Sequence, residues 1–240
     1  MPLPKIATPT YELVLPSSNK KIKFRPFLVK EEKILIIAME SQDTTQIANA
    51  VKDVISHCII SRGIKVEKLS TFDIEYLFLN IRAKSVGETV EVNITCPDDG
   101  ETTVQMEIDI DSIKVQKDKN HKDTIKLDDT LSMKMKYPSL DQFVENNFEL
   151  AETNNDVNKS LNVITSCIDM VYNEEESWSS ADCTKKELQE FVEQLNTKQF
   201  KEIEQFFSSM PKLSHTVKVK NPNTKVESEV VLEGLASFFS

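Results

Sequence analysis

Two short turns in the sequence have a spacing that could hold a metal ion. Each has a proline at its second position: Cys96-Pro97-Asp98-Asp99-Gly100 and Asn221-Pro222-Asn223-Thr224. A zinc ribbon carries Cys-x-x-Cys at both turns, because zinc takes four close thiolate or imidazole ligands. Here Asp99 stands where the second thiolate would be, the other turn has no cysteine, and His215 is the only nearby imidazole. The sequence therefore predicts no bound metal, and leaves two interpretations: a metal-free relative of a zinc knuckle, or two ordinary hairpin turns.

The residue types that commonly carry catalysis are scattered along the chain. The three histidines stand at positions 57, 121 and 215, with no serine or cysteine nucleophile motif beside them. The four glycines form no phosphate-binding loop. Asp109, Asp111, Asp128 and Asp129 lack the spacing, the glycine and the final glutamate of an EF-hand loop. We therefore expect no enzyme, no catalytic residue, no cofactor and no metal ligand, with catalysis by dispersed residues as the open alternative.

The composition is that of a globular protein with an uneven charge. Of the 240 residues, 39% are hydrophobic and 28% are charged, and the net charge is −10. The acidic excess lies entirely in residues 137–210, since the remainder carries equal numbers of acidic and basic side chains. An acidic chain without a basic stripe is a poor candidate for binding nucleic acid or an anionic membrane. The acidic segment is either a solvated helical lobe or a surface that steers a basic partner.

No stretch approaches the ~20 apolar residues of a membrane span. The first five residues contain no apolar core of a secretory signal, so none is expected. The four cysteines are far apart in the sequence and are interpreted as reduced thiols.

The clearest pattern covers residues 69–110, a helix followed by a hairpin. Apolar residues occupy nearly every face of the helix predicted at 71–86, so it should be covered on more than one side. Ser70 is its expected N-cap, with Asp73 as the partner in a capping box. From Val90 to Ile108 the apolar period changes to 2, which predicts two strands joined at Cys96-Pro97-Asp98-Asp99-Gly100.

The remaining elements are expected on both sides of this region. We expect strands at 11–15, 21–24, 124–127, 131–136, 216–220 and 225–231. We expect helices at 30–40 (with Ile34, Leu35, Ile37 and Ala38 facing inward), from Thr44 or Thr45 to 60, from Ser139, at 154–172, from Thr184 and from Thr197. Residues 174–180, with the single tryptophan Trp178, are expected to form a polar loop.

These elements predict an α+β fold, a mixed body of β-hairpins and helices with an inserted acidic helical lobe. We expect residues 1–136 to form the body and 137–210 the lobe. Residues 211–240 should complete the body, because their hairpin is too short to be stable alone.

The C-terminal tail is rich in large apolar side chains. Leu232, Leu235, Phe238 and Phe239 lie within eight residues, and such groups at a free terminus need cover. They pack either on the protein's own sheet or on a partner. We predict the second, with Leu235, Phe238 and Phe239 as partner-binding residues.

Several stretches of the sequence resemble the T4-type baseplate family of contractile-tailed phages. They are residues 2–13, 24–33, 72–79, Thr95-Cys96-Pro97 and 232–239. The resemblance spans most of the chain and is nearest to the versions found in marine cyanophages. It implies a baseplate hub subunit or hub assembly protein, and the family has no catalytic residues to carry over.

The same resemblance implies partners and a location. The partners would be other baseplate hub or tail proteins, without nucleic acid or membrane. The location would be the host cytoplasm during assembly, or the tail baseplate of the virion. Some relatives carry fuller Cys-x-x-Cys knuckles at the two turns, and this sequence departs from them. The alternative function is a zinc-ribbon-derived protein-binding adaptor or assembly chaperone that is absent from the mature virion.

Overall fold

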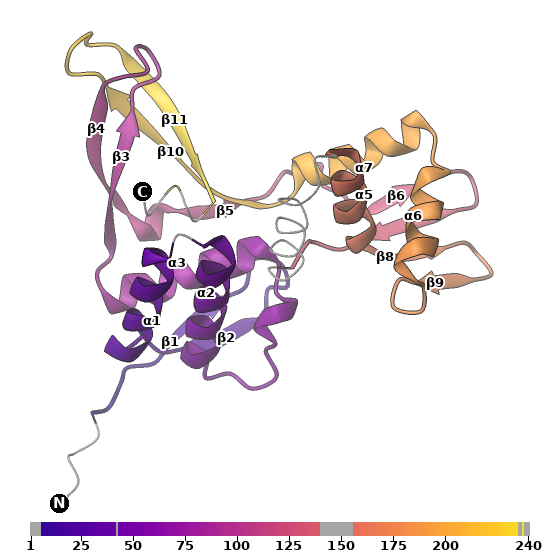
Figure 1. Cartoon of the computed structure of the whole chain (residues 1–240), viewed down its shortest axis with the longest axis horizontal. Coiled ribbons are helices and arrows are strands. Elements are labelled where there is room, and N and C mark those ends of the chain that lie inside the picture. The colour runs from indigo at the N-terminus through magenta and orange to yellow at the C-terminus, as the bar shows by residue number, and fades with distance from the viewer. Residues whose placement is uncertain (1–5, 42, 140–155, 235–236, 238–240) are drawn as a thin grey trace, which may run out of the picture. The chain divides into compact units, whose positions relative to one another are not determined.

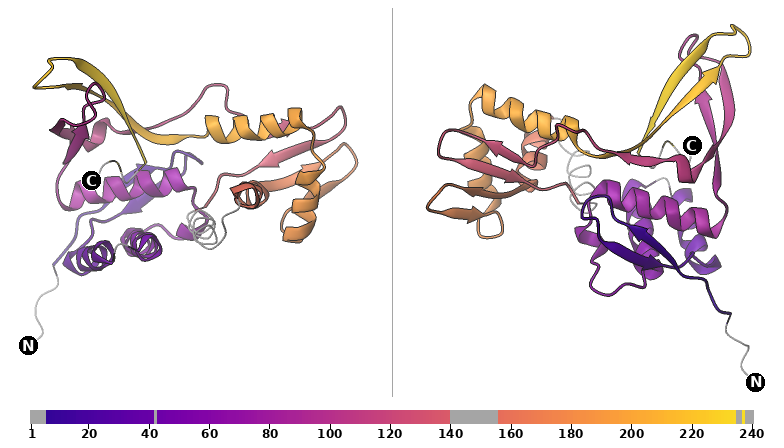
Figure 2. Two further views of the ribbon diagram at one scale, coloured as in Figure 1. Left: turned by 45° about the horizontal axis from the view of Figure 1, so that its top comes forward. Right: turned by 180° about the vertical axis from the view of Figure 1, so that it is seen from behind.

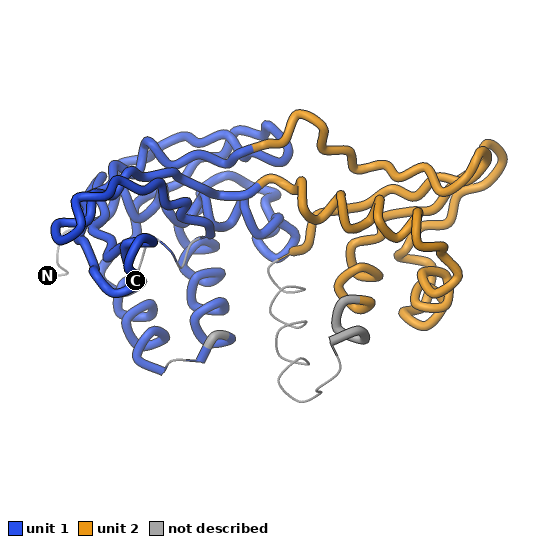
Figure 3. Tube along the Cα trace, turned by 90° about the horizontal axis from the view of Figure 1, so that it is seen from above, with its two compact units in different colours: residues 1–116, 212–240 blue, residues 117–211 orange. Residues whose placement is uncertain are grey.

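The structure is a computed structural model that describes residues 6–41, 43–139, 156–234 and 237. The helix expected from Ser139 and the tail residues Leu235, Phe238 and Phe239 therefore lie outside the described residues. The helices and strands form an α+β mixture, as the sequence predicts. The chain divides into two compact units, residues 1–116 with 212–240, and residues 117–211 (Figure 3).

The first unit begins with a hairpin and continues with three helices (Figure 1). The hairpin consists of β1 (Tyr11–Val14) and β2 (Lys21–Phe24). The helices are α1 (Val29–Glu40), α2 (Thr44–Cys58) and α3 (Thr71–Ser85), with a short 3-10 turn at Val66–Lys68. The predicted elements are confirmed here, although Asp43 rather than either threonine caps α2, since its side chain accepts the N–H groups of Thr45 and Gln46.

Helix α3 is the most buried helix of the first unit. Leu77 and Ile81 lie on one face and Leu79 on the opposite one, and all three are fully buried. The helix contacts α2, β5 (Lys114–Gln116) and β10 (Lys212–Lys220), and Figure 2 shows it among these elements. The expected cover on more than one side is thus confirmed. The capping box is wrong: Ser70 makes no side-chain cap bond, and the buried Asp73 instead accepts hydrogen bonds from Ser17, in the β1–β2 turn.

Two long hairpins complete the first unit. Strands β3 (Thr89–Thr95) and β4 (Thr103–Asp109) pair with each other, and a 3-10 turn at Ile110–Ser112 follows them. Strand β10 pairs with β11 (Glu227–Glu233) on one edge and with β5 on the other. Both hairpins alternate buried apolar and exposed polar residues, which confirms the predicted period-2 pattern. Their inner faces and α3 share one apolar core.

The second unit is a four-stranded antiparallel sheet with helices. The strand order is β6 (Thr124–Lys126), β7 (Ser132–Met135), β8 (Ile168–Tyr172) and β9 (Ser177–Ser179). The helices are α5 (Asp156–Ser166), α6 (Lys185–Glu193) and α7 (Thr197–Ser209). Thr184 caps α6, as predicted, and forms a capping box with Glu187, whereas the cap of α7 is Asn196 rather than Thr197.

Two expected elements of this unit are wrong. The helix expected at 154–172 ends at Ser166, and residues 168–172 form β8, because β7 offers them a strand edge and their side chains suit a sheet. Trp178 lies in β9 rather than in a loop. The pairing of β7 with β8 also moves β6 and β7 into the second unit. The division in the structure therefore falls after Gln116, whereas we expected it after residue 136.

Candidate functional site

The two turns singled out in the sequence contact each other at the tips of the long hairpins, which lie side by side in Figures 1 and 2. The Nδ2 atom of Asn221 donates to both carboxylate oxygens of Asp98, each at 3.1 Å, and to Oδ2 of Asp99 at 2.8 Å. Thr224 donates its hydroxyl to Asp98. Asn223 donates Nδ2 to Oγ1 of Thr102 at 3.0 Å. We call Asp98, Asp99, Thr102, Asn221, Asn223 and Thr224 the polar clasp.

The two turns of the polar clasp have the same backbone shape. Gly100 and Lys225 occupy equivalent positions and both lie in the left-handed region, with φ of 68° and 65°. The N–H of Gly100 donates to the carbonyl of Cys96 at 2.9 Å, and the N–H of Lys225 donates to that of Asn221 at 3.0 Å. Two similar turns that face each other favour the interpretation as a metal-free relative of a zinc knuckle.

The side chains of the polar clasp do not fit a zinc ion. Cys96 is the only thiol there, and burial, reinforced by the nearby carboxylates of Asp98 and Asp99, raises its pKa. Hydrogen bonds from Thr224 and Asn221 to Asp98, and from Thr102 and Asn221 to Asp99, lower the pKa of both carboxyls. Across the described ranges, no three His, Cys, Asp or Glu side chains are grouped so that they could hold a metal. His215 lies in β10 opposite Leu232, away from the turn.

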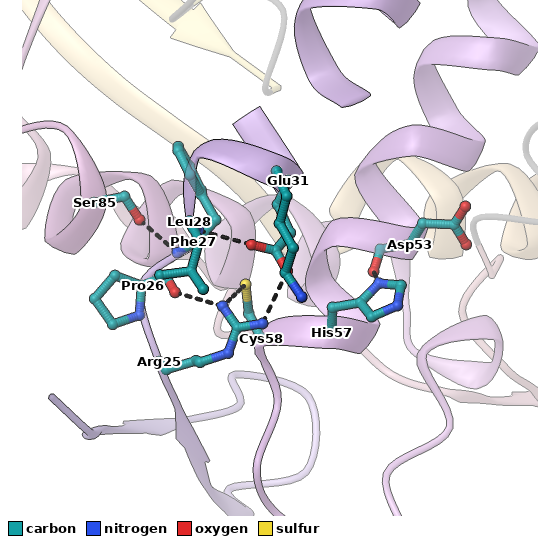
Figure 4. A network of polar contacts seen from close by, with 10 residues as sticks. Arg25, Pro26, Phe27, Leu28, Glu31, Asp53, His57, Cys58 and Ser85 are labelled. Atoms are coloured by element: carbon teal, nitrogen blue, oxygen red, sulfur yellow. Dashed lines mark hydrogen bonds and ion pairs between the residues drawn. The ribbon is translucent and has the colours of Figure 1, made fainter. Parts of the chain in front are cut away.

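A second polar network fixes the start of α1 (Figure 4). The Nη2 atom of Arg25 donates to Oε1 of the buried Glu31 at 2.9 Å, and Oε2 of Glu31 accepts the N–H of Leu28 at 2.8 Å. The Nη1 atom of Arg25 donates to the carbonyl of Pro26 and lies 3.8 Å from Sγ of Cys58. Burial alone would raise the pKa of Glu31, but the hydrogen bonds from Arg25 and Leu28 and the charge of Arg25 lower it to about 2.

This network determines which side of α1 faces inward. Glu31 and Ala38 lie seven residues apart on one face, and both are buried. Ile34 and Ile37 were expected inward, which is wrong: their side chains are 39% and 55% exposed. Since every residue from 34 to 39 is apolar, the sequence pattern could not indicate which face is buried. The buried Arg25–Glu31 ion pair determines it. The exposed apolar residues of this region are Leu28, Val29, Ile34, Ile36, Ile37 and Met39.

The comparison with known protein families decides the identity of the chain. The model of a family described as T4 bacteriophage base plate protein matches residues 8–240. The chain belongs to this family. No curated protein and no solved structure matches it.

Family membership makes the chain a phage baseplate protein, a structural type of tail component whose interaction partners are other tail proteins. The resemblance to T4-type baseplate proteins is confirmed at this level. The family is generally non-enzymatic and associated with the virion tail. In the described ranges, none of the helices has the length and apolar character that crossing a membrane requires.

His57 and its neighbour Cys58 are the first candidates for catalysis to place in this baseplate protein. His57 is exposed on α2, and its Nδ1 atom lies 2.7 Å from the carbonyl of Asp53. The neighbouring Cys58 is buried, and burial raises its pKa to about 11, so the thiolate that a nucleophile requires is disfavoured.

His121 contacts a serine that the sequence did not reveal, because the two residues are 88 positions apart. Its ring stacks with Tyr137 and lies against Phe206, and its Nδ1 atom is 2.9 Å from Oγ of Ser209. Ser209 donates its own proton to the carbonyl of Gln205 at 2.6 Å. While the Ser209 proton is directed to Gln205, the ring of His121 donates to Ser209 rather than accepting its proton.

The predicted partner-binding residues Leu235, Phe238 and Phe239 lie outside the described part of the chain. Leu232, the first apolar residue of the same segment, is buried in the core that the two long hairpins share. Ser237 is the next described residue, and its N–H donates to the carbonyl of Gly234. Partner binding by the tail therefore stays a prediction.

Proposed function

We propose that this baseplate protein is a non-enzymatic component of the baseplate hub, or a factor that assembles the hub. The observation that carries the proposal is the extent of the family match, residues 8–240, which includes both structural units. Neither unit is therefore left over as a domain with a separate activity. The exposed apolar residues of α1 suit a protein whose work is to bind other proteins.

Loss of the gene tests this role. A phage with an early stop codon should produce intact heads without contractile tails, as seen by electron microscopy of lysed cells. Supplying the wild-type chain from a plasmid should restore tails, and supplying a chain that stops after residue 116 should not, because it lacks the second unit and the β10–β11 hairpin. Normal infectious particles from the mutant phage would refute the proposal.

A second candidate is a zinc-ribbon-derived adaptor or assembly chaperone that leaves before the virion is mature. The similar shapes of the two turns in the polar clasp favour it. Quantitative mass spectrometry should compare purified virions with tail intermediates from infected cells. A hub component is present in both at constant ratio to other baseplate proteins, whereas a chaperone occurs only in the intermediates. Elemental analysis of the purified protein tests the expected absence of zinc.

We also propose that Leu235, Phe238 and Phe239 contribute to the interface with a hub partner. The support is compositional: three large apolar side chains follow Leu232, which is already used in the protein's own core. Burying one such side chain is worth ~1.5–3 kcal/mol, so the phenylalanines would be effective anchors.

A further inference from the structure

One face of α1 combines apolar and charged residues in a row. The helical period places Val29, Lys33, Ile36 and Glu40 on one side, with Ile37 beside them. Val29 is 80% exposed, Ile36 51% and Ile37 55%. Lys33 and Glu40 are exposed, and neither forms an ion pair with any residue in the part of the chain that the structure describes. We call Val29, Lys33, Ile36, Ile37 and Glu40 the outer α1 face.

The neighbouring helix α2 does not share this exposure of apolar side chains. The outward residues of α2 are polar, among them Gln46, Asn49, Asp53 and Ser56. Its apolar residues Val51, Val54 and Ile55 are buried. The two helices pack side by side, so a helix with an ordinary solvated face lies next to one whose solvated face is apolar. Such a face needs a partner to cover it.

We propose that the outer α1 face binds the same face of a second copy of this chain, with the two helices antiparallel. A two-fold axis between Ile36 and Ile37 places Ile36 opposite the partner's Ile37. The same axis places Lys33 opposite the partner's Glu40, and Glu40 opposite the partner's Lys33. The apolar centre is thereby covered, and both charges acquire an opposite charge.

Charge complementarity selects this occupant over others. A parallel arrangement of two copies would place Lys33 against the partner's Lys33, which is repulsive. A wholly apolar partner would cover Lys33 and Glu40 without a counter-charge, and burying an unpaired charge is costly. Of these arrangements, only the antiparallel pairing gives both Lys33 and Glu40 a counter-charge while it covers Ile36 and Ile37.

The dimer should be weak. One face of a 12-residue helix is a small contact compared with the roughly 1,200–2,000 Å² of a stable interface. We therefore expect a dissociation constant that is roughly micromolar or weaker. Sedimentation equilibrium of the full chain over a wide concentration range would measure it.

Charge exchange is the decisive test. K33E and E40K each place like charges opposite one another across the axis, and each should weaken the dimer by about tenfold or more. The double variant K33E/E40K exchanges both charges and should return the dissociation constant to within about threefold of wild type. Lys33 and Glu40 are seven residues apart, too far to pair within one helix, so the rescue reports contact between copies. The matched control is D53K on the exposed face of α2, which should leave dimerisation unchanged.

Two outcomes would overturn the proposal. A wild-type chain that remains monomeric at all concentrations would leave the outer α1 face to a different tail protein. Single variants that weaken association without rescue in the double variant would exclude the antiparallel pairing. Circular dichroism of each variant verifies that the exposed substitutions leave the fold intact. The experiment measures self-association alone, so its outcome does not depend on whether the chain acts in the baseplate hub.

Discussion

Replacing Asn221 by alanine should open the polar clasp and destabilise the first unit. The Asn221 side chain is fully buried, and its Nδ2 atom joins the β10–β11 turn to Asp98 and Asp99. Its Oδ1 atom also accepts the N–H groups of Asn223 at 2.8 Å and Thr224 at 3.3 Å. Alanine keeps the backbone of the turn but removes the donor and the acceptor together.

The expected loss follows from the groups that are left without a partner. Two part-buried backbone N–H groups lose their acceptor, and an unsatisfied buried polar group costs ~1–3 kcal/mol. Water can reach the exposed carboxylates of Asp98 and Asp99, so the loss of their hydrogen bonds to Asn221 adds little to the cost. We expect the free energy of unfolding to fall by about 2–3 kcal/mol, and the melting temperature of the first unit by about 4–12 °C.

The assay is thermal and urea unfolding of N221A beside the control N223A. Asn223 is exposed, and its side chain makes one bond, to Thr102, so its removal should cost less than about 1 kcal/mol. Hydrogen exchange should show faster exchange at both hairpin tips in N221A alone. If N221A unfolds like N223A, the clasp does not link the hairpins energetically and the reasoning is refuted.

The pH dependence of the free energy of unfolding gives a second test of the polar clasp. Hydrogen bonds hold the pKa values of Asp98 and Asp99 below their ordinary value of 3.8 in the folded chain. Their contribution to stability is therefore present above about pH 4 and is lost as the pH falls below it. Because Asn221 supplies part of this effect, N221A should lose less stability than wild type on acidification.

Three further predictions concern other residues. In urea unfolding, E31Q should lower the free energy of unfolding by about 3 kcal/mol, because it leaves the largely buried Arg25 without its counter-charge. The control E32Q should lower it by less than about 0.5 kcal/mol. Since the pKa of Glu31 is lowered from 4.5 to about 2, E31Q should lack the wild-type loss of stability between those pH values. Burial lowers the pKa of His121, so wild type should lose stability as the pH falls below 6.5, and H121Q should show a flatter profile in melts at several pH values. F238A/F239A should reduce copurification with hub proteins far more than it lowers the melting temperature; an early-melting or normally assembling double variant would contradict partner binding by the tail.

The sequence determined the elements whose signals are local. The two long hairpins follow from period-2 alternation around proline-containing turns, and each turn is closed by bonds between near neighbours. The burial of α3 follows from apolar residues on nearly every face, which no solvated helix tolerates. The N-cap of α6 at Thr184 is likewise a local signal. The family resemblance was also readable from short stretches of sequence, and the family match confirms it.

Tertiary structure decided everything that depends on a distant partner. Residues 168–172 form a strand because β7 is available to pair with them, and local periodicity alone favoured a helix there. The inward face of α1 was set by the Arg25–Glu31 pair, since a run of apolar residues has no preferred side. Asn221 and Asp98 are 123 residues apart, so the sequence revealed two similar turns but not the bonds between them. A side chain's hydrogen-bond partner is selected by the packing of whole elements, and that packing is not encoded in any short segment.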